Sequence, residues 1–103
     1  MHVVVSQEDL AHGLQIVSRA VASKTTLPVL SGILLETRSQ TLHLATSDLE
    51  ISIEYDVPAN IKTDGAVVLP ARYFSELIYR IPTEDLELEV DLSNYTAQIR
   101  WGR

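Results

Sequence analysis

The 103-residue chain contains no cysteine. This absence excludes disulfide bonds, cysteine-ligated zinc, iron–sulfur clusters and thiol catalysis, and it suits a reducing compartment, so we expect a cytoplasmic protein. Glycine is also sparse. Its four occurrences, Gly13, Gly32, Gly65 and Gly102, are isolated from one another, so the sequence has no glycine-rich loop that could cradle a phosphate. The G-x-S-x-G motif of serine hydrolases is absent as well.

Long apolar runs and positive charge are equally scarce. No run approaches the ~20 apolar residues that a membrane-spanning helix needs, and the N-terminus lacks the pattern of a signal peptide, so we expect no membrane partner. Eight basic residues stand against 14 acidic ones, which gives a net charge of −6. This balance excludes an ordinary basic nucleic-acid module held by phosphate contacts alone. The hydrophobic content of 46% indicates a globular chain of one domain.

The first half of the chain predicts a strand, a helix and three further strands. Val3-Val4-Val5 is β-branched, and Ser6 with Asp9 resembles a helix-capping pair. An apolar stripe predicts a helix over about residues 7–22, in which Gly13 permits a close contact. Strand-like patterns then cover 30–37, 41–46 and 49–57, and a loop is expected from Pro58 to Gly65. The stripe of the helix consists of Leu10, Leu14, Val17 and Val21.

The second half repeats the beginning of this order. A strand at 66–69 precedes a helix over 70–80, and alternating patterns predict strands at 86–91 and 95–101. A turn at Ser93-Asn94 would place Glu87 opposite Arg100. The two strand–helix pairs match at an offset of 64, for example Val3 with Val67. We therefore expect two repeats, 1–57 and 66–103, of which the second lacks its last strand and leaves an open sheet edge.

Catalytic and metal-binding patterns are weak. The histidines, His2, His12 and His43, have no partner at metal-ligand spacing, and His43 lies between two leucines in a strand, so we expect it to face solvent. Asp48, Glu50 and Glu54 could serve acid–base chemistry or hold Mg²⁺, but the solvent face of a strand is the favoured interpretation. Nothing nearby supplies a nucleophile, so a small hydrolase using Asp48 and Glu50 is the least favoured hypothesis. We expect no metal and no cofactor. The cations of the helices and the acids of the strands show a mild sorting of charge.

Three segments together resemble one known family, and the resemblance covers essentially the whole chain. They are Thr26-Leu27-Pro28-Val29-Leu30-Ser31-Gly32, Ala45-Thr46-Ser47-Asp48-Leu49-Glu50-Ile51 and Val68-Leu69-Pro70-Ala71-Arg72-Tyr73-Phe74. In order and spacing they are similar to the N-terminal domain of the bacterial DNA polymerase III beta subunit, the sliding clamp. The resemblance implies an α+β clamp fold, in which antiparallel sheets back two helices in two strand–helix–strands repeats.

The same resemblance implies a non-enzymatic processivity factor. Clamp chains carry three such domains and form a homodimeric ring around duplex DNA, with helices inside and sheets outside. The implied partners are duplex DNA, the polymerase and the clamp loader. By position, Lys24 and Arg72 match family residues near the DNA, and helix geometry adds Arg80 and Arg19.

The resemblance also leaves alternatives open. The family continues beyond Arg103 into a final strand and two more domains, which carry most of the partner-binding pocket. We therefore expect this chain to be part of a longer clamp. The alternative is a free-standing protein-interaction module that binds a partner strand at its open sheet edge.

Overall fold

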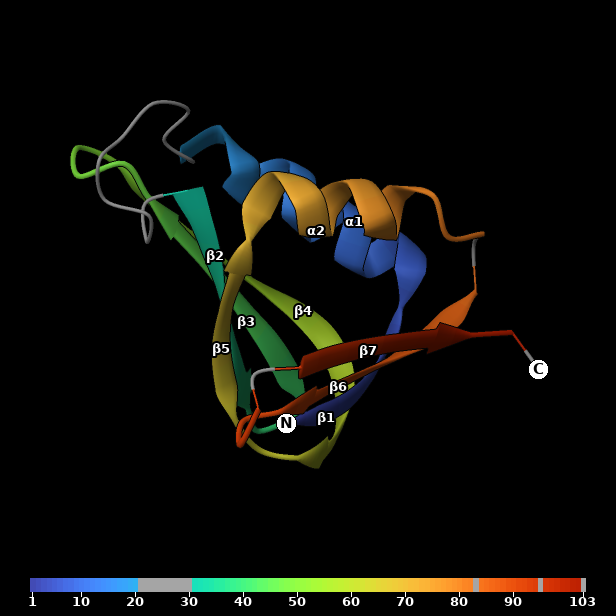
Figure 1. The fold of residues 1–103 in the computed structure, drawn as a ribbon. Coiled ribbons are helices and arrows are strands. Elements are labelled where there is room, and N and C mark those ends of the chain that lie inside the picture. Colours follow the sequence, from blue (N-terminus) through green and yellow to red (C-terminus); the bar gives the residue numbers. More distant parts are fainter. Residues whose placement is uncertain (21–30, 83, 95, 103) are drawn as a thin grey trace.

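The computed structural model describes residues 1–20, 31–82, 84–94 and 96–102. Seven strands form one antiparallel sheet in the order β5-β2-β3-β4-β1-β6-β7, and two helices lie together over one face of the curled sheet (Figure 1). This arrangement confirms the predicted α+β class. The elements are β1 (His2–Ser6), α1 (Gln7–Val17), the short 3₁₀ turn η1 (Ser18–Ala20), β2 (Gly32–Arg38), β3 (Thr41–Ser47), β4 (Ser52–Thr63), β5 (Ala66–Pro70), α2 (Ala71–Tyr79), β6 (Asp85–Asp91) and β7 (Thr96–Trp101).

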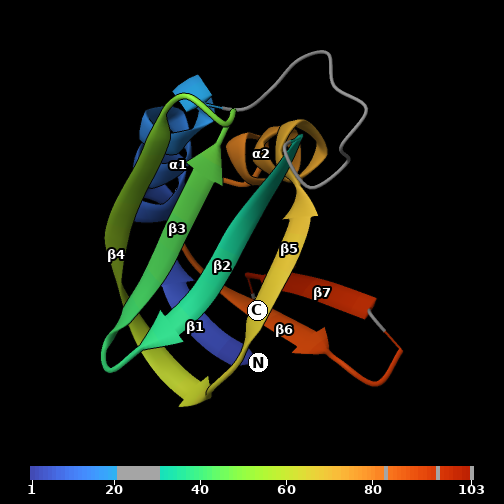
Figure 2. The same cartoon turned by 90° about the vertical axis from the view of Figure 1, so that its left-hand side faces the viewer.

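The two halves of the chain are interleaved within this sheet. β1 pairs with β6 of the second half, from His2↔Glu89 to Ser6↔Asp85, and β5 pairs with β2 of the first half. Figure 2 shows β5 running beside β2. The strand–helix pairs begin at positions 2 and 66 and at 7 and 71, which agrees with the offset of 64. Because each half supplies a strand to the ladder of the other, neither half has a complete sheet of its own. The division at 1–57 and 66–103 stays a prediction.

β4 differs most from the prediction. We expected a loop after residue 57, but the strand continues through Pro58 to Thr63. Its first part pairs with β3 up to Thr41↔Pro58, and its second part pairs with β1 from Val5↔Ala59 onwards. Pro58 has no N–H to donate, and it lies at the point where the strand changes partners, so proline is tolerated here. The amide of Ala59 resumes the backbone hydrogen bonding with the carbonyl of Gln40 at 3.1 Å.

The start of β4 was also predicted wrongly. The sequence pattern predicts a strand from residue 49, but Leu49 and Ile51 lie in a turn and are 72% and 57% exposed. The carboxylate of Asp48 accepts hydrogen bonds from the amides of Glu50 and Ile51 at 3.0 and 2.8 Å. This side-chain turn competes with strand pairing, and Leu49 takes a φ of 81°, so the alternating pattern begins only at Ser52.

The first helix begins as the sequence indicated and ends earlier. The hydroxyl of Ser6 accepts from the Asp9 amide at 3.3 Å, which confirms the predicted cap. α1 ends at Val17 and continues as η1, whereas we predicted a helix to residue 22; positions 21 and 22 lie outside the described residues. Leu10, Leu14 and Val17 are fully buried. Neither helix in the described part of the chain is long enough to cross a bilayer, since α1 has only 11 residues.

The second helix and the β6–β7 hairpin largely follow the prediction. Pro70 is the N-cap of α2 rather than a helical residue, and Phe74 and Ile78 face the core while Leu77 is 40% exposed. Glu87 pairs with Arg100, as expected from the opposite charges. The core lies between the helices and the inner face of the sheet, where the side chains of all seven strands meet those of α1 and α2.

Gly13 brings α1 against the sheet. A Cβ at this position would lie 2.7 Å from Cγ2 of Val57 and 3.0 Å from Cδ1 of Leu44. We expect Gly13→Ala to lower the free energy of unfolding by about 1–3 kcal/mol, because overpacking outweighs the helix propensity of alanine. Urea unfolding would measure this, with the exposed Gln15→Ala as the near-neutral control. A gain in stability for Gly13→Ala would contradict the close contact.

Candidate nucleic-acid interface

The two helices lie side by side and antiparallel on one face of the sheet (Figure 1). At the start of α1, the buried Gln7 side chain donates from Nε2 to the carbonyl of Ile78 in the last turn of α2, at 3.0 Å. The Gln7 amide donates to the carbonyl of Glu84 at 3.0 Å. Gln7 therefore fixes how the helices sit against each other. No local sequence pattern marks Gln7 as buried, because a polar residue just after a helix cap is ordinarily exposed.

The predicted DNA-binding residues do not gather at one place. Arg19 lies in η1, beyond the end of α1, and Arg72 lies in the first turn of α2, so the antiparallel packing directs both toward the same end of the helix pair. Arg80 is the C-cap residue of α2, at the opposite end, where α1 begins with Glu8 and Asp9. Arg72 and Arg80 are exposed, and Arg19 is exposed as well. Lys24 lies outside the described residues.

Arg72 occupies an electrostatically unfavourable position in its helix. Unsatisfied amides give a helix N-terminus a partial positive charge, which favours acidic side chains there rather than a cation. α2 has no acidic residue in its first turn, and its N-cap, Pro70, makes no side-chain hydrogen bond to the helix. The guanidinium and the amides therefore add up to a positive potential that attracts an anion such as a phosphate.

Two arginines of the strands form ion pairs with carboxylates. Nη2 of Arg38 lies 2.9 Å from the carboxylate of Glu36, and Nη2 of Arg100 lies 2.8 Å from that of Glu89. Within residues 1–20, 31–82, 84–94 and 96–102, no ion pair involves Arg19, Arg72 or Arg80. The unpaired arginines are thus on the helix side, where their charge is available to a ligand.

The sorting of charge between helices and strands is clearer in the structure than in the sequence. The described helices, together with η1 and the C-cap residue Arg80, carry three acidic and three basic residues, whereas the strands carry seven acidic and three basic ones. The acidic residues of the central strands alternate with core residues and therefore point to the outer face of the sheet, away from the helices. The helix side is close to neutral with a positive end, and the outer face is strongly negative.

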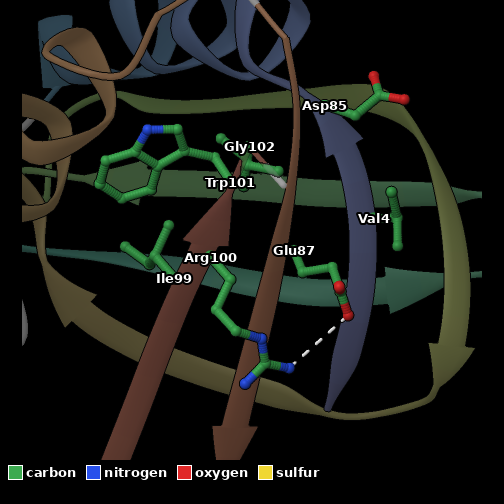
Figure 3. Close-up of a pocket in the computed structure, with 8 residues that line it drawn as sticks. Val4, Asp85, Glu87, Ile99, Arg100, Trp101 and Gly102 are labelled. Atoms are coloured by element: carbon green, nitrogen blue, oxygen red, sulfur yellow. Dashed lines mark ion pairs between the residues drawn. The ribbon is translucent and has the colours of Figure 1, made fainter.

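An open groove runs along the edge formed by β6 and β7 (Figure 3). Ile99 and Trp101 lie on one side of β7, and Arg100 and Glu87 lie on the other, joined by the ion pair drawn in Figure 3. The hydrogen bond from His2 and the charge of Arg100 hold the pKa of Glu87 below its ordinary value. Trp101 continues the apolar inner face of the sheet but is 50% exposed. β7 is the last strand in the order of the described sheet, so no further strand lies beside it there.

Asp48 and Glu50, considered above for acid–base chemistry, belong to the turn before β4. The backbone amides of Ile51 and Glu50 lower the pKa of the Asp48 carboxyl, so this group stays ionised as the acceptor that forms the turn. Glu50 is exposed. In the described part of the chain, no three histidine, aspartate or glutamate side chains are placed to hold a metal ion.

The family of the chain follows from comparison with known proteins. The sequence model described as "DNA polymerase III beta subunit, N-terminal domain" matches residues 1–101. The chain belongs to this family. The beta sliding clamp of Bacillus subtilis is 33% identical over 111 residues, which cover 100% of this chain and 29% of that protein. That of Halalkalibacterium halodurans is 32% identical over 110 residues, which cover 99% of this chain and 29% of the relative.

Solved structures give the same result for the fold. The crystal structure of a DNA polymerase III beta subunit from Eubacterium rectale superposes with a TM-score of 0.94 at 31% identity, and covers 100% of this chain and 28% of its own. The Bacillus subtilis sliding clamp superposes with a TM-score of 0.93 at 33% identity, covering 100% of this chain and 29% of its own. The clamp fold is therefore confirmed. The chain spans less than a third of the length of these relatives.

The Gln7 contact is testable. We expect Gln7→Ala to lower the free energy of unfolding by about 1–3 kcal/mol, because it removes a buried hydrogen bond to Ile78 and leaves a void between the helix ends. Chemical denaturation would measure the change. Gln40→Ala, at an exposed glutamine, is the matched control and should have little effect. Equal stability of the two variants would show that Gln7 does not hold the helices together.

Proposed function

We propose that this chain acts as the N-terminal domain of a DNA sliding clamp, a processivity factor that encircles duplex DNA and tethers the replicative polymerase. The observation that carries the proposal is the match of the whole chain to sliding clamps in sequence and fold. The chain has no catalytic part in this function. DNA is held by enclosure rather than by tight binding, which is compatible with a net charge of −6.

The helix side is the proposed DNA-facing surface. Arg19 and Arg72 lie toward the same end of the helix pair, and neither has an ion pair among the described residues. The N-terminus of α2, which has no side-chain cap, adds its partial positive charge at this end. Contacts of this kind position a protein on the phosphate backbone without reading sequence, as sliding requires. Arg80 and Lys24 remain predicted contacts, and Arg80 is the weaker candidate because acidic residues begin the neighbouring helix. The acidic outer face would repel DNA and leave the helix side as the attractive one.

Unpaired strand edges support association into a ring. Residues 52–57 of β4 pair only with β3 among the described strands, and β7 pairs only with β6. The half-exposed Trp101 on β7 and Leu77 on α2 add apolar surface on the helix side of the sheet. Edges and apolar surface together favour contact with further domains or a second chain. Polymerase and clamp loader are proposed partners of the assembled ring.

The open edge of β7 also favours a second function. A module that adds a partner strand to this edge would need the same backbone groups. Successive amides of β7 point alternately to β6 and to the open edge. Proline at two consecutive positions, tested one at a time, therefore distinguishes the loss of a hydrogen bond to β6 from the loss of a donor at the open edge. Loss of protein binding with unchanged DNA retention would favour this second function.

The clamp function predicts that DNA retention depends on topology and on the helix arginines. In a hybrid, these 103 residues replace the matching N-terminal segment of the Bacillus subtilis clamp. We expect the hybrid to remain on nicked circular DNA and to slide off once the circle is linearised. Arg19→Gln with Arg72→Gln should shorten the retention time. The log–log slope of binding against salt should fall by about 0.9 for each phosphate that the variant no longer neutralises.

Arg38→Gln with Arg100→Gln is the matched control. It changes the net charge by the same amount, but it removes arginines that are already paired on strands. The control should retain DNA as the unmodified hybrid does. Equal retention on circular and linear DNA would contradict binding by enclosure, and equal effects of the two double variants would contradict the helix-side contact.

A further inference from the structure

His43 is buried on the acidic outer face of the sheet. The prediction that His43 faces solvent was correct for the face of the sheet but wrong for the exposure of the ring. His43 points away from the core, as its place between Leu42 and Leu44 requires. Its side chain is only 5% exposed. The ring lies over β4, with Nδ1 at 2.6 Å from Oδ1 of Asp56 and Nε2 at 2.7 Å from Oε1 of Glu54. Neighbouring side chains cover it, although the sheet face itself is open.

This geometry identifies the state of the ring. Carboxylates are acceptors, so both ring nitrogens must donate, but neutral imidazole carries only one N–H. Both hydrogen bonds form together only with the doubly protonated, positively charged ring. The two carboxylates lie at opposite nitrogens and so do not converge on a common point, which distinguishes the arrangement from a metal site. The cation also lies between two negative charges on one strand.

Other charged groups near the ring lie on β2. Glu36 is the cross-strand neighbour of His43 and is paired with Arg38. Arg38 disfavours the charged ring, and so does burial, which has the largest single effect. The hydrogen bonds to Asp56 and Glu54 outweigh both, so the pKa of His43 lies above its ordinary value of 6.5.

We propose that His43 is a proton-dependent clasp between β3 and β4. In its charged form it binds Glu54 and Asp56 together, and after loss of one proton it can donate to only one of them. The released carboxylate then faces the other acids of the outer surface without a compensating charge. The part of β4 held by the clasp, residues 52–57, has only β3 as a partner among the described strands. The clasp therefore stabilises a stretch of β4 that is paired along only one of its edges.

The pH dependence follows from the direction of the pKa. Because the folded state binds this proton more tightly than the unfolded chain, the stabilisation is complete below the unfolded-state pKa of about 6.5. It is lost as the pH rises through the folded-state pKa. Each unit between the two values multiplies the unfolding equilibrium constant by about ten across that range.

The direct test is an NMR titration of the ¹⁵N-labelled, unmodified chain from about pH 5.5 to about pH 9. We expect both ring nitrogens of His43 to carry protons near pH 7, and His43 to lose its proton at higher pH than a free imidazole, whose pKa is about 6.5. This measurement requires no variant, so it does not depend on how a substitution folds. A His43 ring that is neutral near pH 7, or that has a pKa at or below the free value of about 6.5, would overturn the proposal.

Urea unfolding of variants tests the consequence. In the unmodified chain, we expect the unfolding equilibrium constant to rise between about pH 6 and about pH 8.5. Glu54→Gln with Asp56→Asn should reduce that rise severalfold, because neither amide favours the charged ring. Glu50→Gln removes an exposed carboxylate from the adjacent turn and should leave the rise unchanged, and His2→Gln shows what the His2–Glu87 pair contributes. An unreduced rise in the Glu54–Asp56 variant would contradict the clasp.

Discussion

The first strand of each half of the chain pairs with a strand of the other half, and the rest of the fold depends on these two ladders. β1 pairs with β6 and β5 pairs with β2, while β4 changes partners at Pro58 and joins the two groups of strands into one sheet. Each helix follows directly from an exchanged strand, so the ladders also set where the helices begin. A single core between helices and sheet is the result, and neither half completes it alone.

The same arrangement separates two surfaces of different charge. Alternation within the strands sends apolar side chains to the helices and acidic ones outward, so the negative charge of the chain accumulates on the outer face of the sheet. Among the described residues, the helix side holds equal numbers of acidic and basic side chains. In that part of the chain, Arg19, Arg72 and Arg80 have no ion pair, whereas carboxylates pair with Arg38 and Arg100. On the outer face, burial disfavours the charged form of His43, and the hydrogen bonds of its ring to Glu54 and Asp56 offset that cost.

Local sequence patterns predicted most strands and helices correctly. The predictions were wrong where a contact with a distant residue determines the structure. The cap at Ser6, the core stripe of α1 as far as Val17 and the register of Glu87 with Arg100 depend on neighbours in sequence or on one hairpin, and they are confirmed. The continuation of β4 through Pro58 depends on the distant partner β1, which no local pattern indicates. The solvent-facing prediction for His43 failed because carboxylates from the next strand cover its ring.

The sequence alone determined most of the strands and helices, the near-repeat of the strand–helix pairs and the exclusion of disulfide, thiol and glycine-loop chemistry, because composition and periodicity are properties of the chain itself. Only the tertiary structure decided which arginines lie toward the same end of the helix pair. Antiparallel packing, anchored by Gln7 on Ile78, directs Arg19 and Arg72 to one end and leaves Arg80 beside the acidic start of α1. Such grouping depends on how two helices meet, and spacing within one helix does not contain that information.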